Sequence, residues 1–167
     1  MGKIWVDIVP SVSPDGSDAK KTLTKSVQCD IEEALTKAIV AGLPSNFSEK
    51  DSDKPKDKRD DYAARAVRLI PELTMSVEAK GAKASSDGKV SLTIEMLRLK
   101  SANESGEFVG ATSAKVSGVD KRGAIADVVV DLAKMLIKEA GLSDMVKKLL
   151  SGSEFKKQAA QRNLPVD

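Results

Sequence analysis

Residues 73–96, LTMSVEAKGAKASSDGKVSLTIEM, carry the pattern that decides the fold. In the first seven residues apolar and polar side chains alternate, and the same alternation returns in the last seven. A period of two is typical of strands that have one face on the core and one face in water. The turn-forming sequence Ser86-Asp87-Gly88 lies between the two halves, so the segment predicts a β-hairpin with its turn at these residues.

The flanking sequence extends this hairpin into a meander. A third antiparallel strand is expected at 108–116, where small residues such as Gly110 thin the strand. Upstream, residues 62–70 fit either a short helix or the start of a strand. Pro71 predicts a boundary after them, because proline disfavours helical backbone in the residue before it.

The rest of the chain alternates between apolar runs and helical stripes. Residues 3–10 predict an interior strand that stops at Pro10, and the next dozen residues predict a loop. Apolar residues recur at three and four between 23 and 40 and again between 125 and 137, and a short helix is expected at 143–150. The sequence therefore predicts an α/β (α+β) fold in the order β-α-β-β-β-α-α, with about four strands in a mixed sheet and the helices mainly on one face.

The charge pattern sets the expected domain limits. Residues 1–150 are expected to form a single α/β domain. Within it, residues 45–61 contain six acidic and five basic residues among 17, which predicts a mobile charged loop. Residues 151–167 are expected to form a polar C-terminal tail that frays.

Composition excludes several kinds of active site. The chain has no histidine and one cysteine, Cys29, so a histidine-based triad, a zinc site of the usual ligands and an internal disulfide are ruled out. Cys29 is interpreted as a small, partly buried filler. Residues 15–22 resemble a phosphate-binding loop only in context, because Asp15 and Lys20 stand where glycines are needed. No catalytic residue, cofactor or metal ligand is predicted, and the protein is not expected to be an enzyme.

Charge gives little reason to expect nucleic acid as a partner. Lys and Arg total 27 against 25 acids, and the few aromatic residues are scattered. The basic residues that do cluster in the meander fit a charged strand edge that discourages pairing with other chains. They are Lys80, Lys83, Lys89, Arg98, Lys100 and Lys115.

Asp7, inside an apolar strand, is expected to pair with a nearby Lys or Arg or to face solvent.

Two interpretations of the start of the chain stay open. No stretch has the length and apolar character of a membrane helix, and no secretory leader precedes the strand that begins at Lys3. This pattern fits a native cytosolic start, and it equally fits a protein whose leader has been removed.

The order of these segments resembles bacterial envelope lipoprotein domains. The strand at 3–9, the helix at 27–40, the hairpin about Asp87-Gly88, the returning strand at 110–116 and the closing helix at 125–137 are similar to the family that includes the curli-secretion lipoprotein and the penicillin-binding-protein activators, and to YajG-type lipoproteins. The resemblance covers roughly residues 3–140 in pattern, without a specific residue motif. It implies a non-catalytic accessory domain of the periplasm or outer membrane, tethered by a lipidated cysteine that lies outside this sequence.

We therefore expect a protein-interaction or assembly domain that acts through loops or an exposed strand edge. Its partner is expected to be another envelope protein or a second copy. The alternative is a cytoplasmic binding module for a small ligand or nucleic acid. The candidate interaction surface consists of the aromatic residues Trp5, Phe47, Tyr62 and Phe155.

Overall fold

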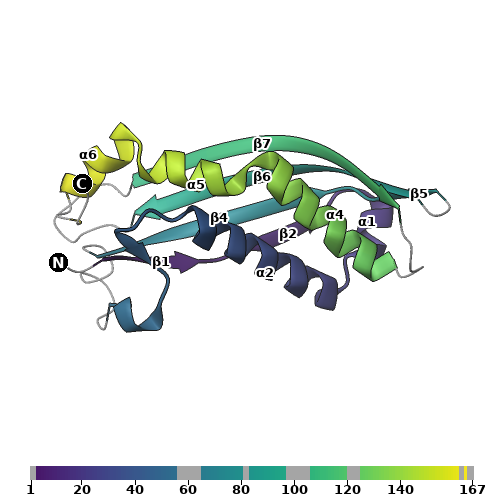
Figure 1. Cartoon of the computed structure of the whole chain (residues 1–167), viewed down its shortest axis with the longest axis horizontal. Helices are drawn as coiled ribbons and strands as arrows, with labels where there is room; N and C mark the ends of the chain where they lie inside the picture. Colours follow the sequence, from purple (N-terminus) through teal and green to yellow (C-terminus); the bar gives the residue numbers. More distant parts are fainter. Residues whose placement is uncertain are drawn as a thin grey trace.

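The computed structural model describes residues 3–55, 65–80, 83–96, 106–119, 125–161 and 164. The helices are α1 (Ser17–Thr22), α2 (Lys25–Gly42), α4 (Ile125–Ala140), α5 (Leu142–Leu150) and α6 (Ser153–Gln161), with a short 3-10 helix η1 (Asp51–Asp53). The strands are β1 (Ile4–Ile8), β2 (Ser11–Pro14), β3 (Phe47–Ser48), β4 (Ala66–Met75), β5 (Glu78–Lys80), β6 (Lys83–Met96) and β7 (Gly106–Val119). Figure 1 shows the helices lying across one side of a single sheet.

The mixed sheet confirms the predicted fold class but contains seven strand segments instead of about four. β3 is followed across the sheet by β1, β4, β6 and β7, and β1 and β3 run parallel to their neighbours. The extra segments are short. β2 pairs with β4 in the same parallel register as β1, and β5 pairs with β6 in the same register as β4. Two of the additional segments are therefore continuations of strands that the sequence predicts.

Two prolines that lie side by side explain why β1 and β2 are separate. The register that pairs Ile8 with Leu69 and Ser11 with Glu72 places Pro10 beside Pro71. Neither residue has a backbone N–H, so no hydrogen bond can be donated across the sheet at this level. The predicted boundary at Pro71 was wrong, because β4 continues through it and Pro71 pairs with Leu92 of β6. The predicted loop after Pro10 was also wrong, since this part of the chain forms β2 and α1.

The hairpin between β4 and β6 turns at a different place from the one that the sequence indicates. Ser86, Asp87 and Gly88 lie inside β6, where Asp87 is the pairing partner of Lys115. The last described pair before the turn is Lys80 with Lys83. The local turn preference of Asp-Gly is outweighed because β6 pairs continuously with β7 along its whole length.

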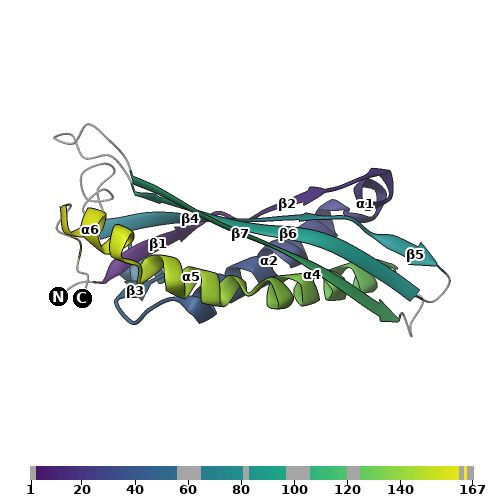
Figure 2. The same ribbon diagram turned by 90° about the horizontal axis from the view of Figure 1, so that it is seen from above.

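Helix α2 forms where the sequence predicts it. The Thr24 side chain caps its first turn by accepting a hydrogen bond from the Val27 N–H at 3.4 Å. Its apolar stripe is buried against the sheet together with residues of α4, which follows β7 along the chain. Figure 2 shows α2, α4 and α5 on the same side of the sheet. The described helices are therefore mainly on one face, as predicted, and none of α2, α4 and α5 covers the opposite face of the central strands.

The C-terminal segment is more ordered than a polar tail. Gly141 has a left-handed backbone (φ 71°) that lets the chain turn from α4 directly into α5. Beyond α5, residues 153–161 of the expected tail form α6, in which Phe155 and Ala159 are fully buried.

Part of the expected charged loop has regular secondary structure, since residues 47–48 form β3 and 51–53 form η1. The limits of the domain remain a prediction.

Candidate interaction site

The free edge of β7 is the longest stretch of unpaired backbone among the strands that the structure describes. All 14 residues of β7 pair with β6, from Gly106 opposite Met96 to Val119 opposite Lys83, without an interruption. No other strand within the described ranges pairs with β7. In an antiparallel pair, half of the N–H and C=O groups of each strand point away from the partner. β7 therefore presents a long row of donors and acceptors that another strand can use.

The sequence of β7 contains few features that block strand pairing. Such features include prolines, bulges and several charged side chains. β7 has no proline, its pairing with β6 shows no bulge, and its only charged residues are Glu107 and Lys115. Of the six basic residues that were expected to guard a strand edge, only Lys115 lies on β7. The basic-edge interpretation therefore does not fit this strand.

The two faces of β7 differ in their surroundings. Ala111 and Ser113 are exposed on the face that points away from the helices. Gly110 lies on the helix-covered face, where an added Cβ would lie 3.0 Å from the Met145 sulfur and 3.1 Å from the Leu149 Cδ1 atom. Glycine at this position allows α5 to pack closely under the strand. Met145 and Leu149 remain only partly buried, so apolar surface accompanies the free edge.

Asp7 takes part in a small network of charges on the open face of the sheet. The Arg68 Nε atom donates a hydrogen bond to an Asp7 carboxylate oxygen at 3.1 Å, and Arg68 Nη1 lies 3.8 Å from a Glu95 oxygen. These residues come from three adjacent strands, β1, β4 and β6. The expectation that Asp7 pairs with a basic residue is confirmed. A carboxylate held by arginine on an open surface serves a structural role and gives no reason to assign it acid–base chemistry.

Replacing Arg68 with methionine is expected to lower the free energy of unfolding by less than about 1 kcal/mol, because the paired side chains are 41% and 33% exposed and water screens their attraction. Urea denaturation of Arg68→Met, Asp7→Asn and the double variant would measure the coupling between the two residues. A coupling free energy above about 2 kcal/mol would contradict this assignment and indicate a desolvated pair.

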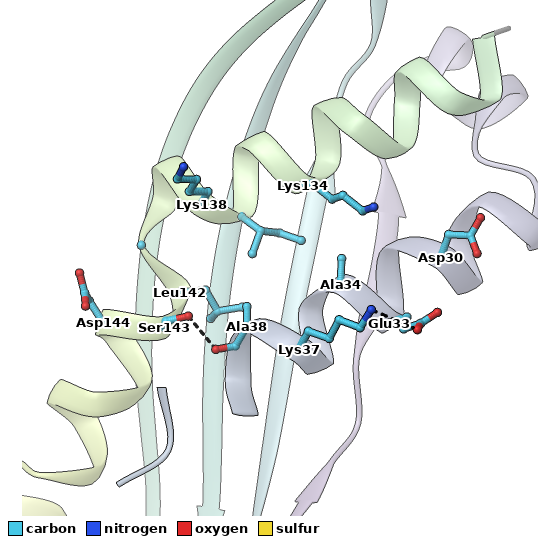
Figure 3. Close-up of a pocket in the computed structure, with 12 residues that line it drawn as sticks. Asp30, Glu33, Ala34, Lys37, Ala38, Lys134, Lys138, Leu142, Ser143 and Asp144 are labelled. Atoms are coloured by element: carbon cyan, nitrogen blue, oxygen red, sulfur yellow. Dashed lines mark hydrogen bonds and ion pairs between the residues drawn. The ribbon is translucent and has the colours of Figure 1, made fainter. Parts of the chain in front are cut away.

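A cleft of about 520 Å³ lies between α2 and the junction of α4 with α5 (Figure 3). Its α2 wall carries Asp30 and Glu33, and its α4 wall carries Lys134 and Lys138. At one end the Ser143 hydroxyl donates a hydrogen bond to the Ala38 carbonyl oxygen at 2.7 Å, which ties α5 to α2. Lys37 of α2 also lines the cleft, 3.5 Å from Glu33, so the α2 wall carries both charges, and the serine of the cleft is already used in helix packing.

The predicted aromatic residues lie in the interior, where the structure describes them. Phe47 and Phe155 are buried and pack on each other, with ring centroids 5.9 Å apart, so β3 and α6 meet at one end of the molecule. Trp5 is buried on the other face of the sheet, where the Lys54 ammonium lies 5.4 Å from its ring centroid. Tyr62 lies outside the described residues. None of the three described rings is exposed to a partner in this conformation.

Cys29 is exposed on α2, which corrects its interpretation as a partly buried filler. Its environment is a solvated helix surface. It therefore provides a unique site for a chemical label.

Within the described residues, no helix combines the length and apolar character needed to cross a membrane.

No protein-family profile and no curated protein matches the chain. Several solved structures do. A neuraminyllactose-binding hemagglutinin homolog from Helicobacter pylori shares 17% identity with a TM-score of 0.50, over 96% of this chain and 88% of its own.

Two further structures align with lower similarity. The dodecamer of a PelC variant from Paraburkholderia phytofirmans has 15% identity and a TM-score of 0.34, over 84% of this chain and 87% of its own. A minor lipoprotein from Acinetobacter baumannii has 14% identity and a TM-score of 0.28, over 92% of this chain and 91% of its own. At these identities, what the chain shares with the Helicobacter protein is its fold.

Proposed function

We propose that this chain is a non-enzymatic interaction or assembly domain of a bacterial cell-envelope protein, and that it acts through the free edge of β7. The observation that carries the proposal is the unbroken 14-residue pairing of β7 with β6 together with an opposite edge that no described strand pairs with. A partner strand added at such an edge gains its affinity from main-chain hydrogen bonds.

The composition of the described surface supports an interaction domain over an active site. On the open face of the sheet, Arg68 pairs with Asp7 and Glu95 in a structural network. The Ser143 hydroxyl is engaged with the Ala38 carbonyl. In contrast, the β7 edge combines unused backbone groups with partly buried apolar side chains of α5. The Helicobacter protein that shares this fold is named as a binding protein, a hemagglutinin homolog, which supports an interaction function for this chain.

A photo-cross-linking amino acid at Ser113 tests the proposal in bacteria that express the gene. Ser113 is exposed near the middle of β7, and Ala41, exposed on α2, is the control position away from the edge. We expect the protein to fractionate with the cell envelope, and we expect the probe at Ser113 to form discrete adducts there that the probe at Ala41 does not form. Recovery of the protein in the cytosol, or equal adducts from both positions, would reject the proposed function.

A further inference from the structure

We infer that the free edge of β7 binds the β7 edge of a second copy of this chain, in an antiparallel pair related by a two-fold axis at Ala111. This inference rests on the proposed function, because it names the partner of the same edge. The result is one continuous sheet through two copies, with both helix layers on the same side.

Symmetry favours β7 as its own partner. An antiparallel strand pair is closed by a two-fold axis, and both copies then use the same residues. The alternative is head-to-tail addition of β7 to the far edge of another copy's sheet, and that edge is interrupted. It consists of β3, with two residues, the residues of β1 that β3 does not pair with, and β2, with four, and Pro10 separates β1 from β2. Pairing β7 with β7 matches two edges of the same length and produces a closed dimer.

The two charged residues of β7 fix the register. With the axis at Ala111, residue 107 of one copy stands opposite residue 115 of the other, and the pair occurs twice by symmetry. Glu107 is acidic and Lys115 is basic, and opposite charges directly across a strand pair stabilise it. Between these two positions the strand holds only uncharged residues, from Phe108 to Ala114. Side chains alternate between the two faces along a strand, and residues 107, 111 and 115 are all odd-numbered. In this register the paired residues of the two copies therefore lie on the same face of the joined sheet.

The surroundings of Gly110 supply apolar surface beside the proposed axis. Gly110 is next to Ala111 and packs directly on Met145 and Leu149 of α5. These two side chains are partly buried in the single chain. A second copy joined at Ala111 brings its own α5 to the same place, so that the four side chains cover one another. The small exposed Ala111 permits close approach of the strands on the opposite face.

Charge variants at Ala111 test the pairing directly. In the proposed dimer Ala111 faces itself, so Ala111→Lys places two lysines opposite each other and Ala111→Glu places two glutamates there. We expect sedimentation velocity to show a dimer for the unmodified chain, and a dimerisation at least about tenfold weaker for each variant alone. An equimolar mixture of the two variants is expected to restore the dimer, because each lysine then faces a glutamate.

The same substitution away from the edge provides the control. Ala41→Lys changes an exposed alanine on α2 and is expected to leave dimerisation unchanged. Labels attached to Cys29, the single cysteine, report mixing by energy transfer between donor-labelled and acceptor-labelled copies. Circular dichroism of each variant would establish that it is folded.

The outcomes separate this inference from the proposed function. A monomeric unmodified chain, a dimer that Ala111→Lys does not weaken, or a mixture of variants that stays monomeric would each overturn self-pairing. If the chain is monomeric while Ser113 cross-links to a different envelope protein, the proposed function stands and the partner is another strand. If the chain dimerises through Ala111 but is found in the cytosol, self-pairing stands and the envelope function is rejected.

Discussion

Replacing Phe155 with alanine is expected to lower the free energy of unfolding by about 3–5 kcal/mol. The Phe155 side chain is fully buried, and its ring packs on Phe47 with the two planes tilted by 45°. Truncation removes the transfer free energy of a large apolar group and leaves a cavity between α6 and β3. It also removes the favourable contact between the two rings, which contributes about 0.5–1.5 kcal/mol beyond burial. Urea denaturation followed by circular dichroism would measure the loss.

The neighbouring residue supplies the control for Phe155→Ala. Lys156 is exposed on the same helix, and Lys156→Ala is expected to change stability by less than about 0.5 kcal/mol. A loss of less than about 1 kcal/mol for Phe155→Ala would mean that α6 does not dock, and that residues 153–161 behave as the polar tail that composition suggests.

The C-terminal helix shows why composition alone misjudged this part of the chain. Within α6, Phe155 and Ala159 are four residues apart, which places them on the same side of the helix. The apolar residues of α6 are Phe155, Ala159 and Ala160, which are too few to form a recognisable helical stripe. The helix is stabilised by burial of Phe155 in the core, where its ring packs on Phe47. The contact between Phe47 and Phe155 joins positions that are distant in the sequence, so a local sequence pattern cannot predict it.

By contrast, long elements that bury one side were predictable from the sequence. The stripe of α2 is buried at Val27, Ile31, Leu35 and Ile39, each at a spacing of four. Such a pattern predicts a buried helix face, because residues spaced by about one helical turn lie on the same side of the helix. The antiparallel order of β4, β6 and β7 was also predictable, since short connections join neighbouring strands. The break at Pro10 beside Pro71 was not, because it depends on the register of two strands that are distant in sequence.

The candidate site was predictable only in part. A strand was expected at 108–116, but its position at the free edge depends on strand order, which the sequence does not display. The aromatic residues were predicted to form the interaction surface, because large rings are common in interfaces. They are also common in cores, and the structure places Trp5, Phe47 and Phe155 there. The available signal for the edge was the uncharged run between Glu107 and Lys115, which lacks proline.

Replacing Gly42 with alanine is expected to destabilise the protein by about 1–3 kcal/mol, although alanine is the better helix former. Gly42 is buried at the end of α2, and a Cβ atom there would overlap the backbone carbonyl oxygen of Ser143 in α5. Backbone atoms of a packed helix cannot rotate aside as a side chain can, so α5 must move away from α2. That movement also stretches the hydrogen bond from Ser143 to Ala38.

A second substitution distinguishes this displacement from a local effect of alanine on the helix end. Ser143→Ala removes the hydrogen bond to Ala38 and is expected to cost about 1 kcal/mol in the unmodified protein. In the Gly42→Ala background it is expected to cost much less, because the bond is already stretched. Ala41→Ser, a change of similar size at the adjacent exposed position, is expected to have little effect. If Gly42→Ala instead stabilises the protein, α2 and α5 do not meet as closely as described. The cleft between α2 and α4 would then lack the fixed end that the contact between α5 and α2 gives it.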